Sequence, residues 1–206
     1  MKVPLRYQMT EYDCGPTSLL NGISFLFERE EIPPEILRSI MLFCLDQYSL
    51  EGYSGTKGTS HTAMQFLSHW LEGFGETGRL DITSIYLHGG DVTLAGGSSL
   101  RNALTRKGVA VTRIDLDGWH YVLLTGAEDQ NVYVFDPYLL KEPFPIPDVQ
   151  TVYDHEYSYN RIVPLKLFES TELHPYSFGP YETREAVVLF NSRSMKPEEF
   201  AVEYFI

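Results

Sequence analysis

Apolar residues in the first part of the chain recur every three or four positions, which is the spacing of a helix that buries one face. The first such stripe predicts a helix over about residues 14–27, and Asp13 stands at the expected N-cap position. A second stripe follows Pro33 and Pro34, and proline suits a first helical turn because no hydrogen-bonded amide is needed there. This second stripe consists of Ile36, Ile40, Phe43 and Cys44. Its spacing assigns Cys44 to packing.

Helical spacing returns further along the chain and then gives way to a strand. Residues 61–71 predict a third helix, the glycine-containing stretch 73–78 predicts a turn, and residues 82–87 predict a strand. Residues 98–107 predict a short helix that Gly108 closes.

The second part of the chain changes to short β-branched or aromatic segments separated by turn residues, as is typical of antiparallel strands. These segments are residues 109–116, 119–125, 132–136, 161–168 and 185–190. A length of 206 residues suits a single domain. We therefore predict an α+β fold in one domain over residues 1–206. A mainly helical half (1–107) packs on a mainly antiparallel sheet half (108–206).

A long loop is predicted over about residues 137–181, where tyrosine and proline are frequent. Two interpretations stay open for this segment. It is either an aromatic-rich excursion that frames a cleft or an ordinary ordered loop.

Composition narrows the classes of partner. Sixteen lysines and arginines stand against 28 aspartates and glutamates, a formal net charge of −12, so nucleic acid is not an expected partner. No apolar run is long enough to span a bilayer, and the first residues lack a secretory signal, so we expect a cytoplasmic protein without membrane insertion. The only two cysteines, Cys14 and Cys44, are expected as thiols in a reducing compartment, although two is also the number that one disulfide needs. The pattern assigns no oligomeric state.

The most informative local segment is QMTEYDCGPTSLL, in which Cys14 opens the first predicted helix. A helix N-terminus offers free backbone amides and a partial positive charge, and both favour the thiolate, the form of cysteine that attacks carbonyl carbon. The amide of Cys14 and the side-chain amide of Gln8, six positions earlier, are candidate donors to an oxyanion. Gly15 is expected to leave room for substrate.

The predicted hairpin WHYVLLTGAEDQNVYVFDP supplies a candidate base. If its turn is centred on Glu128, His120 lies directly opposite Asp136, with Cβ atoms about 5 Å apart. A turn one residue longer shifts the register by one and leaves both residues at the same end of the hairpin. A carboxylate at that distance would orient the imidazole, whose other nitrogen is then free to take the cysteine proton.

Gln8, the DCGPTSLL helix start, the HYVLL strand and the later FDP together resemble the bacteriocin-processing peptidase family of the papain clan, which cuts leader peptides after paired glycines. The resemblance implies a papain-like cysteine proteinase fold. It also implies Gln8 in the oxyanion hole, Cys14 as nucleophile, His120 as base and Asp136 as the residue that orients the base.

The resemblance is uneven along the chain. It is good over residues 6–27 and 108–138, extends only to the kind of element between them, and has no specific counterpart from about residue 139 onward. The best-known members of the family are fused to transport ATPases with membrane spans, and this sequence contains neither. Its substrate therefore need not be an exported double-glycine precursor.

No metal or cofactor site is predicted. His61 and His69 are separated by about 12 Å of helical rise, too far to share one ion, and no HExxH or CxxC motif occurs. The lysine of GTKGTS precedes the glycine and so misses the phosphate-loop order. Ser98 and Ser99 lack the pattern of a nucleophile elbow, and we interpret them as a helix cap.

Three functions follow from these residues. The first is a cysteine peptidase that acts on a flexible, extended peptide. The second is an acyltransferase or amidase with an acyl substrate, because a thioester is released by an amine as readily as by water. The third, a non-catalytic domain that binds peptides, is the least favoured because Cys14, His120 and Asp136 are all present.

Overall fold

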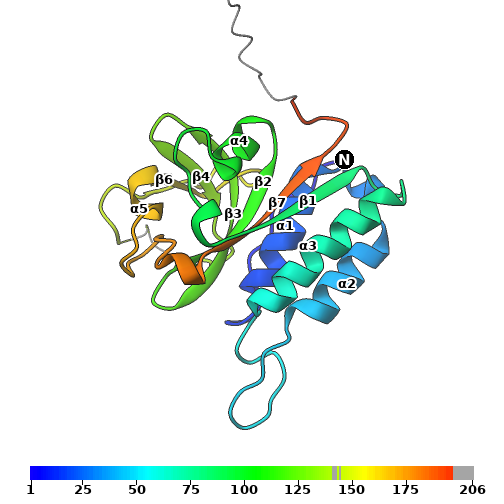
Figure 1. The fold of residues 1–206 in the computed structure, drawn as a ribbon, viewed down its shortest axis with the longest axis horizontal. Helices are drawn as coiled ribbons and strands as arrows, with labels where there is room; N and C mark the ends of the chain where they lie inside the picture. Colours follow the sequence, from blue (N-terminus) through cyan, green and yellow to red (C-terminus); the bar gives the residue numbers. More distant parts are fainter. Residues whose placement is uncertain (141–142, 144, 197–206) are drawn as a thin grey trace, which may run out of the picture.

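The structure, a computed structural model, describes residues 1–140, 143 and 145–196. Three helices lie side by side against one part of an antiparallel sheet, and two short helices belong to the remainder of the molecule (Figure 1). The helices are α1 (Cys14–Leu26), α2 (Pro34–Cys44), α3 (His61–Glu76), α4 (Ser99–Thr105) and α5 (Leu165–Phe168), with 3-10 turns η1 (Arg29–Glu31), η2 (Gly89–Asp91) and η3 (Tyr181–Thr183). No helix in these ranges is both long enough and apolar enough to cross a membrane.

Seven strands form one sheet in the order β1-β7-β2-β3-β4-β6-β5, and all neighbouring strands are antiparallel. The strands are β1 (Ile82–His88), β2 (Val109–Asp115), β3 (Trp119–Glu128), β4 (Asn131–Phe135), β5 (Gln150–Thr151), β6 (Arg161–Pro164) and β7 (Glu185–Asn191). The predicted α+β class with an antiparallel sheet is confirmed. Strand β1 precedes the other strands in sequence by one helix and pairs with β7, so the two halves of the chain share this edge of the sheet.

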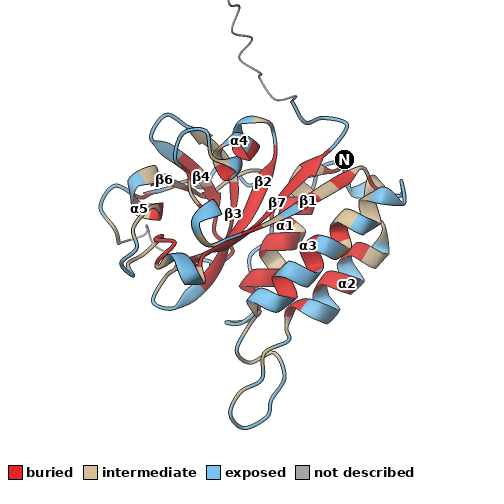
Figure 2. Ribbon diagram, viewed as in Figure 1, coloured by how far each residue is buried: buried red, intermediate tan, exposed pale blue. Residues whose placement is uncertain are grey.

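The central strands of the sheet are largely buried (Figure 2). Apolar side chains fill both faces of the sheet, because successive residues of a strand point to opposite sides. On β3, Tyr121 and Leu123 join the core that contains Leu19 of α1, whereas Val122 and Leu124 join the second core. A strand buried on both faces has few polar positions, which explains the nearly continuous apolar run of β3.

Helix α1 packs closely on the sheet at Gly22. A methyl group added there would lie 3.2 Å from a Leu189 methyl of β7 and 3.3 Å from a Leu123 methyl of β3. The absent side chain therefore sets the spacing between α1 and the two strands.

The predicted ends of two helices are wrong for reasons of packing. Helix α3 continues through the expected turn to Glu76, and Gly75 within it faces β1 so closely that any side chain would overlap the carbonyl of Ile82. At the end of α4, Lys107 and not Gly108 takes the left-handed conformation, with φ of 66°. Gly108 is needed instead because a side chain there would collide with Phe190.

Two further predictions need correction. Phe43 belongs to the apolar stripe of α2 but is 41% exposed and packs edge-on against Phe66 of α3, outside the main core. The segment predicted as one strand over residues 161–168 is strand only to Pro164, after which one helical turn, α5, follows.

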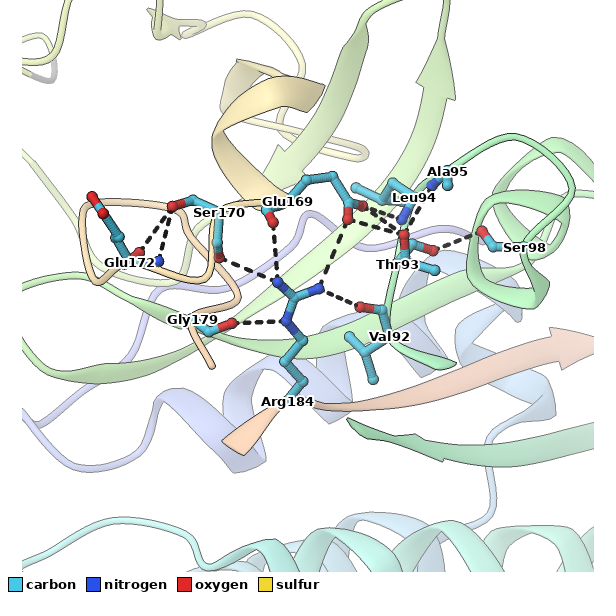
Figure 3. Close-up of polar contacts among 10 residues, drawn as sticks. All are labelled: Val92, Thr93, Leu94, Ala95, Ser98, Glu169, Ser170, Glu172, Gly179 and Arg184. Atoms are coloured by element: carbon cyan, nitrogen blue, oxygen red, sulfur yellow. Dashed lines mark hydrogen bonds and ion pairs between the residues drawn. The ribbon is translucent and has the colours of Figure 1, made fainter. Parts of the chain in front are cut away.

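The segment predicted as a loop over residues 137–181 contains β5, β6 and α5, and its far end is fixed by the buried Arg184 (Figure 3). The guanidinium donates to the carbonyls of Gly179, Val92, Glu169 and Ser170, at 2.8 to 3.3 Å. The Glu169 carboxylate lies 3.8 Å from the same guanidinium. These contacts join the loop around residue 92 to residues 169–179 and so hold this end of the predicted loop in place.

Candidate active site

Cys14 is the first residue of α1 and is almost fully buried, with 7% of its surface exposed. Asp13 is the N-cap residue of α1, as predicted, but its side chain makes no cap hydrogen bond to a backbone amide of the helix. Its carboxylate instead accepts hydrogen bonds from the backbone amides of Met9 and Thr10, at 3.0 and 2.6 Å. Burial raises the pKa of Asp13, but the donors on Thr10 and Met9 outweigh it, and the pKa lies below its usual value. Asp13 therefore fixes the loop before the nucleophile and leaves the first amides of α1 without a side-chain cap.

The glycine after the nucleophile makes room for protein. A side chain at Gly15 would overlap the side chain of Thr59, from the loop between α2 and α3. Thr59 also donates a hydrogen bond to the sulfur of Cys44, at 3.6 Å. The expectation that Gly15 leaves space for substrate is thus wrong, since Thr59 occupies that space.

His120 and Asp136 form a buried pair in which His120 Nε2 lies 2.9 Å from Asp136 Oδ1. The predicted direct opposition is wrong. Leu123 pairs with Phe135, and continuing that register sets Val122, not His120, opposite Asp136. The two residues are diagonal neighbours on one face, a distance that an imidazole can bridge.

The electrostatics of His120 favour its protonated form. Burial lowers the pKa of His120, but hydrogen bonds to Asp136 and to the Cys14 thiol outweigh this effect and raise the pKa to about 10. Because Nε2 faces Asp136, Nδ1 is the ring nitrogen that remains for Cys14. Asp136 is therefore hydrogen-bonded to one ring nitrogen of His120, and Cys14 is close enough to the imidazole to raise its pKa. The ring of Tyr138 lies edge-on to the imidazole, with centroids 6.5 Å apart.

Asp136 is fully buried and is held through both its backbone and its carboxylate. Asn160 clamps the backbone: its Oδ1 accepts from the Asp136 amide and its Nδ2 donates to the Asp136 carbonyl, both at 2.8 Å. The amide of Tyr138 donates to Oδ1 at 2.9 Å, and the hydroxyl of Tyr176 donates to Oδ2 at 3.2 Å. Asn160 and Tyr176 were not predicted from the sequence, because they lie in the segment without a recognisable motif.

Gln8 lies beside the candidate site, and its hydrogen bonds within the described residues go to other residues than the nucleophile. Its Nε2 donates to the carbonyl of Thr10 at 2.7 Å, and its backbone amide donates to the carbonyl of Pro137 at 2.9 Å. Its Oε1 is buried and has no hydrogen-bond partner among the residues that the structure describes. Gln8 shares a cavity with His120.

Two cavities meet at Trp119 and Glu11, one beside Cys14 and the other beside His120. The cavity beside Cys14, of about 580 Å³, is mainly polar and includes Tyr12, Thr59, His61, Arg113 and Tyr121. The cavity beside His120, of about 700 Å³, is more apolar and includes Leu116, Tyr138, Ile146 and Pro175. The proposed nucleophile and base therefore line two neighbouring hollows.

No known family model matches the chain, and no curated protein matches it. The geometry alone describes the site.

The other residues considered from the sequence, Cys44 and Ser98, have structural roles. Both cysteines are free, and Cys44 is fully buried, which raises the pKa of its thiol to about 12. Ser98 caps α4, as its hydroxyl accepts from the amide of Arg101 at 3.2 Å. Within residues 1–140, 143 and 145–196, no group of three or more His, Cys, Asp or Glu side chains is placed to hold a metal ion.

Proposed function

We propose that the protein is a cysteine peptidase of the papain-like type, with Cys14 as nucleophile, His120 as base and Asp136 as the residue that orients His120. The hydrogen bond between His120 and Asp136, together with the effect of Cys14 on the pKa of His120, carries the proposal. The arrangement suits the fold that the resemblance implies, because a helix tip supplies the sulfur and an antiparallel sheet supplies the imidazole.

In the first half of the reaction, the Cys14 sulfur attacks the carbonyl carbon of a peptide bond while the imidazolium of His120 stands beside it. The tetrahedral intermediate then collapses, the C–N bond breaks, and His120 gives its proton to the leaving amine. In the second half, neutral His120 takes a proton from water, whose oxygen attacks the thioester carbon. The acid is released, and the thiolate and imidazolium form again.

The amide of Cys14 and the side-chain amide of Gln8 are the proposed donors to the oxyanion. The uncapped first turn of α1 supports the former, and the position of Gln8 at the His120 cavity supports the latter. We further propose an extended peptide as substrate, with leader-peptide processing as the form that the resemblance suggests. Free Cys14 and Cys44 suit a reducing compartment such as the cytoplasm.

Alkylation at low pH tests the proposal, and Cys44 is the internal control. At pH 6, iodoacetamide should label Cys14 at least about tenfold faster than Cys44 by peptide mapping, because the imidazolium of His120 stabilises a neighbouring thiolate. Equal rates would contradict it. Activity on a peptide library should disappear in Cys14→Ser, and an acyl group that stays on Cys14 until an amine is added would favour an acyltransferase instead.

A further inference from the structure

The carboxylate of Asp136 has two oxygens, and each has its own role. Oδ1 faces His120, whereas Oδ2 accepts a hydrogen bond from the hydroxyl of Tyr176 at 3.2 Å. Tyr176 is fully buried and lines neither of the two cavities beside Cys14 and His120. Its hydroxyl is therefore placed to act on the carboxylate and not on a substrate.

The backbone of Tyr176 is held in an uncommon conformation. Its φ of 70° lies in the left-handed region, which a bulky residue enters only at a cost of about 1–3 kcal/mol. The surroundings fix it there: its amide donates to the carbonyl of Asp115 at 2.8 Å, and its ring packs edge-on against Phe168. Such strain persists where the fold needs one particular placement of a side chain, and here that placement is the phenol behind Asp136.

Arg161 is a second buried residue beside Tyr176. Only 3% of the surface of Arg161 is exposed, and its Nη1 donates to the carbonyl of Asn160 at 2.7 Å. Its positive charge is close enough to the Tyr176 hydroxyl to act on the pKa of that group. Burial and Asp136 raise the pKa of Tyr176 well above its usual value, so its hydroxyl stays a donor.

We propose that Tyr176, supported by Arg161, is a positioning residue that fixes the plane of the Asp136 carboxylate so that Oδ1 stays directed at His120. This inference rests on the proposed function, since it assumes that the His120–Asp136 pair serves Cys14. The charged and titratable groups around the pair include Cys14 from α1, Arg161 from β6, Tyr176 from the segment before η3 and Tyr138 beside the imidazole, and Glu11 and Asp117 line the same cavity as His120.

Tyr176→Phe removes the hydroxyl and keeps the ring. Without that donor the carboxylate is free to rotate and the imidazolium is held less well, so iodoacetamide should label Cys14 about tenfold more slowly than in the parent chain at pH 6. At pH 10.5 the two rates should converge, because the imidazole of His120, whose pKa is raised to about 10, is then mostly neutral in the parent chain as well. The matched control is Tyr153→Phe, at a tyrosine that is 70% exposed, and its rates should be unchanged.

A double variant separates positioning from a general loss of structure. If Tyr176 acts through Asp136, Asp136→Asn with Tyr176→Phe should be no slower than Asp136→Asn alone, whereas additive losses would overturn the inference. Urea unfolding of each variant establishes that it is folded. If Tyr176→Phe does not fold, Arg161→Gln replaces it, with a slower reaction expected at pH 6 and an unchanged rate counting against the inference.

The two proposals fail in different ways. If Cys14 of the parent chain reacts no faster than Cys44, the proposed function fails. The pKa of His120 can then still be measured by nitrogen NMR of its ring, without any reaction at Cys14. The imidazole should titrate about one pH unit lower in Tyr176→Phe than in the parent chain. An identical titration would overturn the positioning role alone.

Discussion

His120 and Asp136 are hydrogen-bonded at 2.9 Å although they are not paired across β3 and β4. Near the turn, Gly126 pairs with Tyr133, and that register continued along both strands would put His120 and Asp136 on opposite faces. One extra residue on β3, Thr125, forms a bulge that changes the register by one and returns both side chains to the same face.

Deletion of Thr125 should therefore be tolerated by the site. The shortened strand keeps Leu124 opposite Val134 and Gly126 opposite Tyr133, so the relation of His120 to Asp136 does not change. We expect the alkylation rate of Cys14 at pH 6 to stay within about threefold of the parent chain. A rate near that of Cys44 would show that the bulge shapes the site beyond setting the face.

The pH dependence of stability should report on His120. Its pKa is raised from 6.5 to about 10 on folding, so the stabilisation is complete below pH 6.5 and is lost as pH rises through 10. Between pH 6 and pH 10, the free energy of unfolding should fall by roughly a few kcal/mol more in the parent chain than in His120→Gln. Urea unfolding at both pH values measures this difference, and parallel falls would contradict the raised pKa.

Gln8→Ala should separate turnover from thiolate formation. Loss of one oxyanion donor lowers kcat by about 10²-fold, whereas alkylation forms no oxyanion and needs no such donor. We expect peptide hydrolysis to slow without stopping and labelling of Cys14 at pH 6 to stay unchanged. Equal losses in both measurements would show that Gln8 instead supports the loop through its bond to Thr10.

Gly15→Ala should destabilise the fold by about 1–3 kcal/mol, because its new methyl group overlaps Thr59. The compensating change is Thr59→Gly, which removes the side chain in the way. In thermal unfolding, the double variant should be more stable than Gly15→Ala alone. If it is not, the close contact of Gly15 with Thr59 is not the source of the loss.

Local pattern was sufficient for much of the fold. The apolar stripe beginning at Cys14 predicted α1 to within one residue of its end, because a helix that buries one face has apolar residues every three or four positions. The end of α3 did not follow from the sequence, since Gly75 is retained for a close approach of β1 and not for a turn. Close approaches of this kind are set by the tertiary fold.

The same distinction applies to the site. Cys14 and His120 stand in recognisable segments, and Asp136 follows from the hairpin. Tyr176 and Asn160 reach Asp136 across 40 and 24 positions of the chain, and no local spacing encodes such contacts. The register of the hairpin escaped prediction because a single bulged residue decides it.

Because Gly22 has no side chain, α1 packs close to the sheet, and this packing affects the position of Cys14 at the start of the same helix. Gly22 lies about two helical turns from Cys14, and its spacing from β3 governs how α1 as a whole rests on the strand that bears His120. A methyl group at position 22 would act as a wedge that lifts the helix by a few tenths of an ångström. A substitution at position 22 could thus change the distance between the Cys14 sulfur and the His120 ring without altering any residue of the proposed active site.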